Sequence, residues 1–350
     1  MTDKSDQAKH RKTKKPSAYD VARLAGVSQT TVSFVLNDTP DSNIPQETKD
    51  RIWAAIRELN WRPNSIARAL TSRRSHTIGL ISDEIVTTPY AGNIIQGAQD
   101  AAWASGKMLL MINTSYNTEI ERGAAEMMLE RQVEGIIYAT MYHRPVQVPP
   151  TLSQVPLVLL DCYTKDRSLP SVVPDEVQGG RTATDVLLSK GHRRVGFINN
   201  VDPIPATFGR MEGYKQALES YHVPFDAGLV RSGKSHAETG YRCALELMQL
   251  EERPTALFCY SDNIAMGAYD ALRTLGLSIP DDVAVIGFDN LKLISTQLHP
   301  SLSTMALPHY EMGQWAVRYL LEHCDQSGYA QDLKPIQERI ACSFVQRSSI

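Results

Sequence analysis

The sequence predicts a small all-α unit followed by a larger α/β core of two doubly wound lobes with parallel sheets. Short amphipathic helical patterns fill residues 17–59, and from residue 77 onward continuous apolar runs alternate with amphipathic helical runs. Continuous Val, Ile and Leu runs between helices are typical of parallel strands covered on both faces. The 350 residues suffice for two or three units, each with its own core.

The charge distribution separates the same two parts. Residues 1–74 contain 14 Lys+Arg and 8 Asp+Glu, a net charge of +6, whereas residues 75–350 contain 22 and 31, a net charge of −9. A basic segment joined to an acidic remainder is expected of a nucleic-acid-binding module tied to a part that stays off nucleic acid.

Several classes of protein are not indicated. The five cysteines are widely spaced without a C-x-x-C motif, which argues against a disulfide framework or a zinc site. No secretory segment and no apolar run of roughly 18 residues is present, so we expect a cytoplasmic, nucleoid-associated protein. The chain has no G-x-x-x-x-G-K-[ST], H-E-x-x-H or G-x-S-x-G motif. We therefore expect neither an enzyme, nor a cofactor, nor a metal.

The first part reads as a charged tail, three helices and a linker. Residues 1–16 are polar and predicted to be disordered. Ser17 and Asp20 form a capping-box pattern for a helix through about Ala25, with Val21 and Leu24 predicted to face inward. Gly26 fits the following turn. A second helix is predicted over about residues 29–37 and a third over about residues 46–59; residues 64–71 could form two further turns, marginal alone in water.

The second part alternates strands and helices. The predicted strands are Thr77–Ile81, Met108–Asn113, Gly135–Ala139, Leu157–Asp161, Val195–Asn199, Ala256–Tyr260 and Val283–Phe288. The predicted helices are Tyr90–Ser105, Thr118–Arg131, Glu176–Ser189, Arg210–Tyr221, Glu238–Leu250 and Asp262–Leu275. Two such series in about 275 residues indicate two lobes.

Residues 18–38, AYDVARLAGVSQTTVSFVLND, carry the strongest motif. Ala22, Gly26 and Val32 provide the small residue, turn glycine and core residue of a helix-turn-helix. The second helix then presents short hydrogen-bonding side chains that suit a major groove: Gln29, Thr30, Ser33 and Asn37. The alternative is a small helical subdomain with a polar face, and the positive charge disfavours it.

With these residues in place, the chain resembles the lactose-repressor (LacI/GalR) family of bacterial transcription regulators. The resemblance rests on YDVARLAGVSQTTVSFVLN, AAIRELNWRPN and NSIARAL, and continues through IIQGAQDAA, RQVEGII, SKGHRRVGFI, GRMEGYKQAL, SDNIAMGAYDAL and IPDDVAVIGFDN. It implies four segments: residues 1–16 as a basic tail, 17–63 as a DNA-binding headpiece, 64–76 as a hinge helix and linker, and 77–350 as an effector-binding and dimerisation core whose chain crosses between two lobes of the periplasmic-binding-protein type.

The resemblance implies roles for individual headpiece residues. Five residues match family positions that contact phosphates or orient the reading helix: Ser17, Ser28, Thr31, Asn37 and Thr48. Gln29 and Thr30 match the positions that choose bases. Phe34 is a departure, because most members carry an arginine there. A phenyl ring can touch a thymine methyl group or fill space, but it cannot make the arginine's two bonds to guanine.

A second DNA-contacting element is implied for the hinge. Leu70 matches a leucine that wedges between central base pairs when two hinge helices fold together in the minor groove; Ala67 would allow their close approach, with Asn64 nearby. The alternative is a passive linker. The chain ends at CSFVQRSSI without a leucine heptad tail, so we expect a homodimer on a pseudo-palindromic operator.

Polar residues at predicted strand ends suggest a ligand site, because ligands of doubly wound sheets bind at the carboxyl ends of strands. By strand position and by resemblance, the candidates are Tyr90, Asn113, Asp161, Arg210, Ser261, Asp262 and Asp289. For Asp262 the alternative is a helix N-cap. The carboxylates and the forked guanidinium among these candidates can bind the vicinal hydroxyl groups of a ligand through paired hydrogen bonds. Ser235 replaces a frequent stacking aromatic, so the identity of the ligand does not transfer.

These observations predict a dimeric transcription regulator, a repressor, controlled by a small carbohydrate effector. Two alternatives stay open. In one, a purine-like corepressor tightens DNA binding; in the other, the chain is a ligand-binding protein or enzyme with a basic appendage.

Overall fold

The structure is a computed structural model that describes residues 16–37, 39, 42–62, 75–85, 92–323 and 335–350. The chain forms two separate compact units, residues 1–75 and residues 76–350. The fold class predicted from the sequence, a helical headpiece followed by a two-lobed α/β core, is confirmed. None of the described helices combines the length and the apolar character that crossing a lipid bilayer requires.

The headpiece is a three-helix unit of α1 (Ala18–Ala25), α2 (Gln29–Leu36) and α3 (Gln46–Glu58). The predicted capping box is present, because the Asp20 amide donates to the Ser17 hydroxyl and the Ser17 amide donates to the Asp20 carboxylate. Gly26 ends α1 at φ 68°, a left-handed conformation that glycine adopts without strain. The helices bury Val21, Ala22, Ala25, Val32, Val35, Ile52, Ala55 and Ile56.

The prediction for Leu24 was wrong. Its side chain is 46 % exposed, because Ala22 and Ala25 share the buried stripe with Val21.

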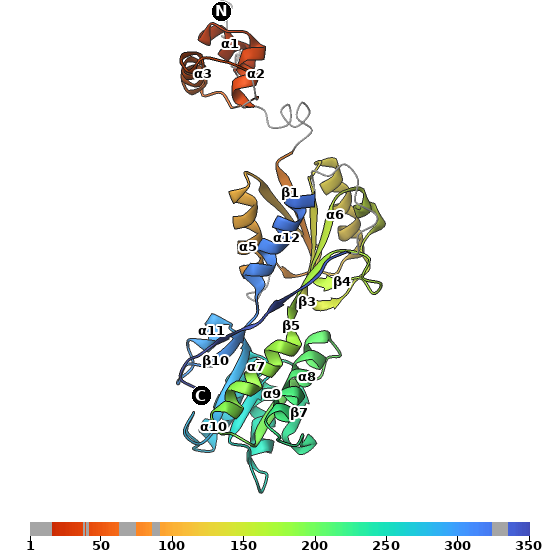
Figure 1. The fold of residues 1–350 in the computed structure, drawn as a ribbon, viewed down its shortest axis with the longest axis vertical. Coiled ribbons are helices and arrows are strands. Elements are labelled where there is room, and N and C mark those ends of the chain that lie inside the picture. Colours follow the sequence, from red (N-terminus) through yellow and green to blue (C-terminus); the bar gives the residue numbers. More distant parts are fainter. Residues whose placement is uncertain (1–15, 38, 40–41, 63–74, 86–91, 324–334) are drawn as a thin grey trace, which may run out of the picture. The chain divides into compact units, whose positions relative to one another are not determined.

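Two six-stranded sheets form the core unit (Figure 1). The first lobe orders its strands β11-β5-β4-β3-β1-β2, and the second orders them β12-β10-β9-β8-β6-β7. The first sheet is parallel throughout, and in the second only β12 runs antiparallel, against β10. Their bounds are β1 Thr77–Ser82, β2 Met108–Asn113, β3 Ile136–Pro145, β4 Leu157–Tyr163, β5 Ser171–Asp175, β6 Val195–Asn200, β7 Val230–Gly233, β8 Ala256–Cys259, β9 Ala284–Asp289, β10 Ser303–Ala306, β11 Gln337–Ala341 and β12 Ser343–Val345.

Helices cover both faces of each sheet. In the first lobe α5 (Gly92–Ala104) and α12 (His309–His323) lie side by side on one face, and α6 (Thr118–Glu130) covers the other. In the second lobe α7 (Glu176–Ser189) pairs with α8 (Pro205–Ser220), and α9 (Ala237–Met248) pairs with α10 (Asp262–Thr274). A short α11 (Lys292–Ser295) follows β9.

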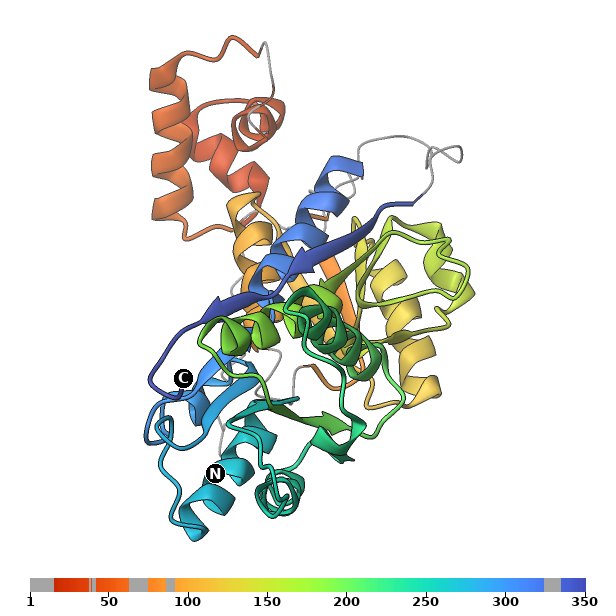
Figure 2. The same cartoon turned by 60° about the horizontal axis from the view of Figure 1, so that its bottom comes forward.

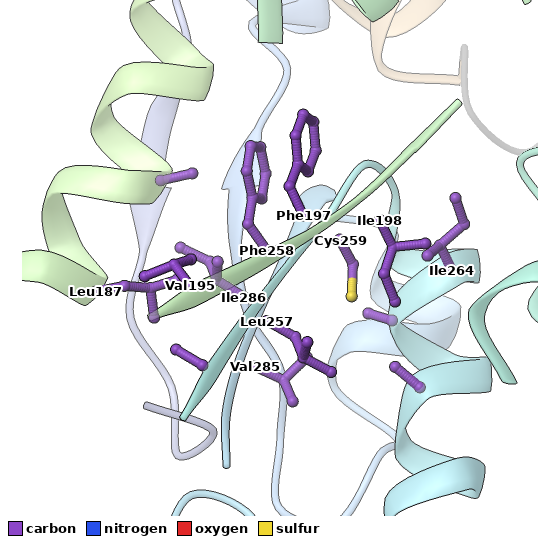
Figure 3. Close-up of a cluster of buried hydrophobic side chains, with 14 of the residues drawn as sticks. Leu187, Val195, Phe197, Ile198, Leu257, Phe258, Cys259, Ile264, Val285 and Ile286 are labelled. Atoms are coloured by element: carbon purple, nitrogen blue, oxygen red, sulfur yellow. The ribbon is translucent and has the colours of Figure 1, made fainter. Parts of the chain in front are cut away.

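The second lobe holds the larger apolar core. Phe197 of β6 and Phe258 of β8 stack with ring centroids 4.5 Å apart, surrounded by aliphatic side chains of the sheet and of α7 and α10 (Figure 3). This rigid interior fixes the ends of β8 and β9, where the polar residues of the next section lie.

The chain passes between the lobes three times. It enters the second lobe between β5 and α7, returns to the first between β10 and α12, and leaves it again between β11 and β12. Figures 1 and 2 show the last passage in dark blue. Each crossing sits between elements that are fixed in different lobes, so the orientation of one lobe on the other depends on a few backbone positions.

The sequence located seven strands and six helices of the core, but it missed several short strands and the long helix α12. All seven predicted strands exist, with every observed bound within six residues of the predicted one, and β2 and α7 have the predicted limits. Five strands and two helices of the described core were not predicted: β5, β7, β10, β11, β12, α11 and α12. Helix α8 also begins at Pro205 rather than Arg210, because a proline fits the first turn of a helix.

Close packing of α9 against α10 gives a first prediction. A methyl group at Gly267 of α10 would lie 1.7 Å from the carbonyl oxygen of Ala237, whereas one at Gly123 of α6 would meet nothing within 4 Å. We expect Gly267→Ala to destabilise the core by about 1–3 kcal/mol through overpacking. The control Gly123→Ala should leave stability unchanged or raise it by up to about 1 kcal/mol. Urea unfolding of both variants measures this, and equal midpoints would contradict the packing.

Candidate DNA-reading helix and ligand cleft

The first turn of α2 is fixed by its own capping residue. The Ser28 hydroxyl accepts from the Thr31 amide at 3.0 Å and bonds the Thr31 hydroxyl at 2.8 Å. Gln29 and Thr30 are exposed at the start of the same helix. Capping therefore uses Ser28 and Thr31 to orient the helix, and leaves the side chains of Gln29 and Thr30 on the surface, where major-groove readers lie.

The remainder of the α2 surface is polar apart from one ring. The Asn37 amide nitrogen lies 3.2 Å from the Ser33 hydroxyl, one turn apart. Phe34 lies between them in sequence and is 41 % exposed. The ring is not among the buried side chains of the headpiece core, so packing inside this unit does not account for it.

Two further headpiece candidates lie near helix starts. Ser17 is engaged in the capping box of α1, and Thr48 lies in the first turn of α3, 3.4 Å from an Arg51 guanidinium nitrogen. The hinge candidates Asn64, Ala67 and Leu70, and the cleft candidate Tyr90, fall outside the described residues.

A cavity of about 800 Å³ lies between the two lobes of the core. Its walls come from the ends of β3, β4 and β5 on one side, and from the ends of β6, β7, β8 and β9 on the other. Of the predicted site residues, the cavity brings together Asp161, Arg210 and Asp289. Such a cleft at the carboxyl ends of parallel strands is where doubly wound folds bind ligands.

Arg210 is the centre of the cleft wall and is only 3 % exposed. Its guanidinium contacts the Glu176 carboxylate at 2.7 and 3.4 Å, donates to the Tyr260 carbonyl oxygen, and lies 3.6 Å from an Asp289 carboxylate oxygen. Its Cζ atom also lies 3.6 Å from the Phe288 ring centroid and 4.3 Å from that of Tyr260. A buried cation is stable only with such partners, and these contacts hold it in one orientation.

The Asp289 carboxyl group lies in a buried environment next to the Arg210 guanidinium. Burial raises the pKa of Asp289 well above its usual range, and the Arg210 charge opposes that shift. Asp289 also has φ 103°, an uncommon conformation for a residue with a side chain. The strand end is therefore held in a strained geometry that aims a carboxyl group into the cavity.

Asp161 occupies the opposite wall at the end of β4. It is 3 % exposed, has φ 57°, and its Oδ1 meets no hydrogen-bond partner among the described residues. Burial and the nearby Glu176 charge raise its pKa well above the usual range for a carboxyl group. A buried acceptor without a partner costs folding free energy, which a ligand's donor could recover.

Three candidates do not line the cavity. Asn113 at the end of β2 accepts from the Ser82 hydroxyl at 3.2 Å. Ser261 caps α10 and bonds Ser235, which does line the cavity, at 2.7 Å. The alternative reading of Asp262 as the N-cap was wrong, because Ser261 holds that position.

Asp262 instead joins three elements of the second lobe. Its carboxylate accepts from the Thr304 hydroxyl and from the Leu291 amide, both at 2.6 Å, and it is fully buried. It thereby ties α10 to β10 and to the loop after β9.

The sequence-based reading missed several residues of the cleft. Glu176, His143, Asn200, Asp202, Lys234 and His236 all line it. Glu176 follows β5, a strand that was not predicted, and His143 lies in an irregular part of β3. Asn200 directly follows a predicted strand end, so the strand-end rule could have included it. In the part of the chain that the structure describes, no cluster of three or more His, Cys, Asp or Glu residues could hold a metal ion.

Comparison with known proteins supports both units. Residues 17–64 match the family model described as bacterial regulatory proteins, lacI family, and residues 75–347 match that of periplasmic binding proteins and sugar binding domain of LacI family. The HTH-type transcriptional repressor PurR of Yersinia pestis bv. Antiqua is 32 % identical over 307 residues, covering 87 % of this chain and 89 % of that protein.

Solved structures show the same architecture. The lac repressor dimer bound to operator and the anti-inducer ONPF has a TM-score of 0.75 at 25 % identity, over 96 % of this chain and 99 % of that one. The complex of the transcriptional regulator CelR with cellobiose has a TM-score of 0.65 at 25 % identity, over 95 % and 99 %.

The environment of Asp262 predicts a pH dependence of stability. Burial raises the pKa of Asp262 to about 7, and the bonds from Thr304 and Leu291 act in the opposite direction. Because the folded-state pKa exceeds that of the unfolded chain, this residue contributes most stability below about pH 4 and progressively less as the pH rises through about 7.

Between pH 5 and 8, we expect the free energy of unfolding to fall more steeply in the wild type than in Asp262→Asn, whose amide oxygen can still accept from the Leu291 amide while its uncharged nitrogen donates to the Thr304 hydroxyl. The exposed Asp270 of the same helix provides the control Asp270→Asn, which should retain the wild-type slope. Urea unfolding at several pH values measures the slopes; identical slopes for all three proteins would refute the assignment.

Proposed function

The chain belongs to the LacI family of bacterial regulatory proteins, and from that premise we propose how its residues divide the work of a ligand-controlled repressor. It is a DNA-binding transcriptional repressor with a ligand-binding core, and it binds operator DNA as a dimer. This function is supported by the combination, in one chain, of a helix-turn-helix headpiece and a two-lobed core that contains a polar cleft.

In this proposal α2 reads the operator. Gln29 and Thr30 select bases, Ser33, Phe34 and Asn37 complete the reading surface, and Ser28 and Thr31 hold the helix in position. Phe34 is exposed and apolar, which suits contact with a thymine methyl group. Ser17 and Thr48 contact phosphates or support the helices that do. Residues 17–63 form this headpiece.

Residues 64–76 form the hinge in this proposal, with Leu70 as the wedge in the minor groove, Ala67 at the contact between paired hinges and Asn64 beside them. A segment of that length gains helical structure only with a partner and DNA. Its folding would then depend on the distance between the two cores of a dimer, which gives the ligand a route to control DNA binding.

Residues 77–350 bind the effector, which we propose is a sugar or sugar derivative held by Asp161, Arg210 and Asp289, with Asn113, Ser261 and Asp262 supporting the walls and Tyr90 as a stacking candidate. Carboxylates with a guanidinium pair well with vicinal hydroxyls.

The protein acts as a regulator rather than as an enzyme. As an operator-binding repressor, it works in the cytoplasm, where the chromosome is; the basic tail, residues 1–16, adds non-specific attraction to DNA.

An operator mobility shift with a panel of sugars tests the proposal. We expect the dimer to shift a pseudo-palindromic operator specifically, and the effector sugar to release it. Tightening by a purine base would support the corepressor alternative instead. The absence of any specific complex would contradict the repressor function and leave a binding protein with a basic appendage.

The cleft assignment predicts the behaviour of Asp289→Asn. Asparagine tolerates the positive φ and keeps the shape, but it removes the charge that faces Arg210 and the ligand. We expect ligand affinity to fall by about 10–150-fold, as for loss of a charged hydrogen bond, while operator binding without ligand stays within about twofold of the wild type.

The matched control is Asp281→Asn, which changes an exposed carboxylate in the loop before β9, at the end of that strand away from the cleft. It should respond to ligand as the wild type does. Calorimetric titration with the effector found in the panel, with mobility shifts alongside, measures both quantities. An unaltered response in Asp289→Asn would exclude Asp289 from the site.

A further inference from the structure

An irregularity in β3 places one imidazole in the wall of the cleft. The pairing of β3 with β4 shifts between Ala139 and Arg144, and regular pairing resumes with Arg144 opposite Cys162. His143 and Asp161, which precede that pair, therefore lie on adjacent strands, and both line the cavity. Bulges of this kind often redirect a side chain next to a functional site.

Thr140 fixes the irregular segment to the strand that carries Asp161. Its hydroxyl lies 2.9 Å from the Asp161 carbonyl oxygen and 2.9 Å from that of Tyr142, and Thr140 is buried. The ring of His143 packs edge-on against Tyr163, with centroids 5.2 Å apart. The positions of His143 and Asp161 are thus set by the framework and do not depend on a ligand.

Both side chains offer hydrogen-bonding capacity that the described residues do not use. Asp161 Oδ1 and both ring nitrogens of His143 are buried without a hydrogen-bond partner there. Burial lowers the pKa of His143 to about 4, and the charges of Arg167 and Arg339 act in the same direction. The imidazole is therefore neutral near pH 7 and has an acceptor nitrogen, and the Asp161 carboxyl group, which also accepts, lines the same cavity.

Carboxyl groups outnumber cationic groups among the buried and nearly buried side chains that line the cleft. One guanidinium, Arg210, faces three buried or nearly buried carboxyl groups, those of Glu176, Asp289 and Asp161. Its donors already serve Glu176 and the Tyr260 carbonyl oxygen, with Asp289 at 3.6 Å. At the rim, the positive charge of Lys234 is matched by an ion pair with Asp202. Burial raises the pKa of both Asp161 and Asp289, so a cationic ligand would favour their ionised forms, whereas an anionic ligand would oppose ionisation and meet a guanidinium that already has partners.

From this arrangement we propose that the effector carries a positively charged amino group, which donates hydrogen bonds to Asp161 and His143, and that it carries no phosphate or carboxylate. An ammonium group has three donors and no acceptor, which suits the acceptors on this wall, and its charge favours the ionised form of Asp161. The chemical class is an amino sugar or another amino polyol. This inference rests on the proposed role of the cleft as the effector site.

Two other classes of ligand fit the cleft less well, neutral hydroxyl compounds and sugar phosphates. A neutral hydroxyl compound would satisfy the two acceptors but leave the surplus of carboxyl groups, which would then have to stay protonated. A sugar phosphate would bring its charge next to Asp161 and Asp289. Arg167 and Arg339 do not line the cavity, so they give a phosphate no direct contact there.

Matched sets of sugars test the proposal on the full-length dimer. Each set has one skeleton in three forms: glucose, glucosamine and glucose 6-phosphate, with the corresponding galactose and mannose sets. Thermal shift at pH 7 and low salt identifies binding, and calorimetry gives Kd. In the skeleton that fits, we expect the amino form to bind about tenfold or more tightly than the neutral form, as for a hydrogen bond with a charged donor, and the phosphate form not to bind.

Two variants connect that preference to the named residues. Asp161→Asn should reduce the amino-to-neutral ratio to about threefold or less, and His143→Phe should weaken the amino form while preserving ring packing on Tyr163. Asp166→Asn changes an exposed carboxylate on the loop after β4 and should keep the wild-type ratio. Operator binding without ligand establishes that each variant is folded.

The outcome separates this inference from the function on which it rests. Tighter binding of a neutral or phosphorylated form, or no binding of any amino form, overturns the amine proposal. If operator binding persists in that case, the repressor function stands. If the wild-type protein forms no specific operator complex, the proposed function itself fails.

Discussion

The buried guanidinium of Arg210 is the constraint on which the cleft depends. A cation with 3 % exposure must find partners within the protein. These come from separate elements: Glu176 at the start of α7, the Tyr260 carbonyl oxygen after β8 and Asp289 at the end of β9. Close packing of α7 on α8 makes this possible, because a methyl group at Gly180 would lie 2.4 Å from the Arg210 carbonyl oxygen.

The same cluster lies where the chain changes lobes. Glu176 directly follows β5, the last strand of the first lobe before the chain enters the second, and Asp161 faces the cavity from β4. A ligand that contacts both walls therefore favours one relative orientation of the lobes. In the proposed mechanism, a change of lobe orientation at the three crossings alters the separation of the hinges in a dimer. This is a physical route from ligand to DNA.

The sequence alone predicted the elements whose burial is encoded locally. Capping at Ser17, the turn at Gly26 and the apolar strands carry their own signals, as do the strand-end carboxyl groups Asp161 and Asp289. Strands such as β7 and β12, of four and three residues, carry too little periodicity to detect and exist because neighbouring strands pair with them. Glu176 and His143 were missed for a related reason. Their place in the cleft comes from long-range pairing and from a register shift.

If the cleft and the operator site are coupled, thermodynamic linkage makes that coupling measurable from either site. The measurement is calorimetric titration of the effector into free protein and into the protein saturated with operator. Linkage is reciprocal. The operator must change the affinity for the effector by the same factor by which the effector changes the affinity for the operator, typically about 5–150-fold. We predict weaker effector binding to the operator complex, by a factor in that range. Equal affinities would mean that the cleft does not control operator binding, because an effector that binds the free and the operator-bound protein equally cannot change the affinity for the operator.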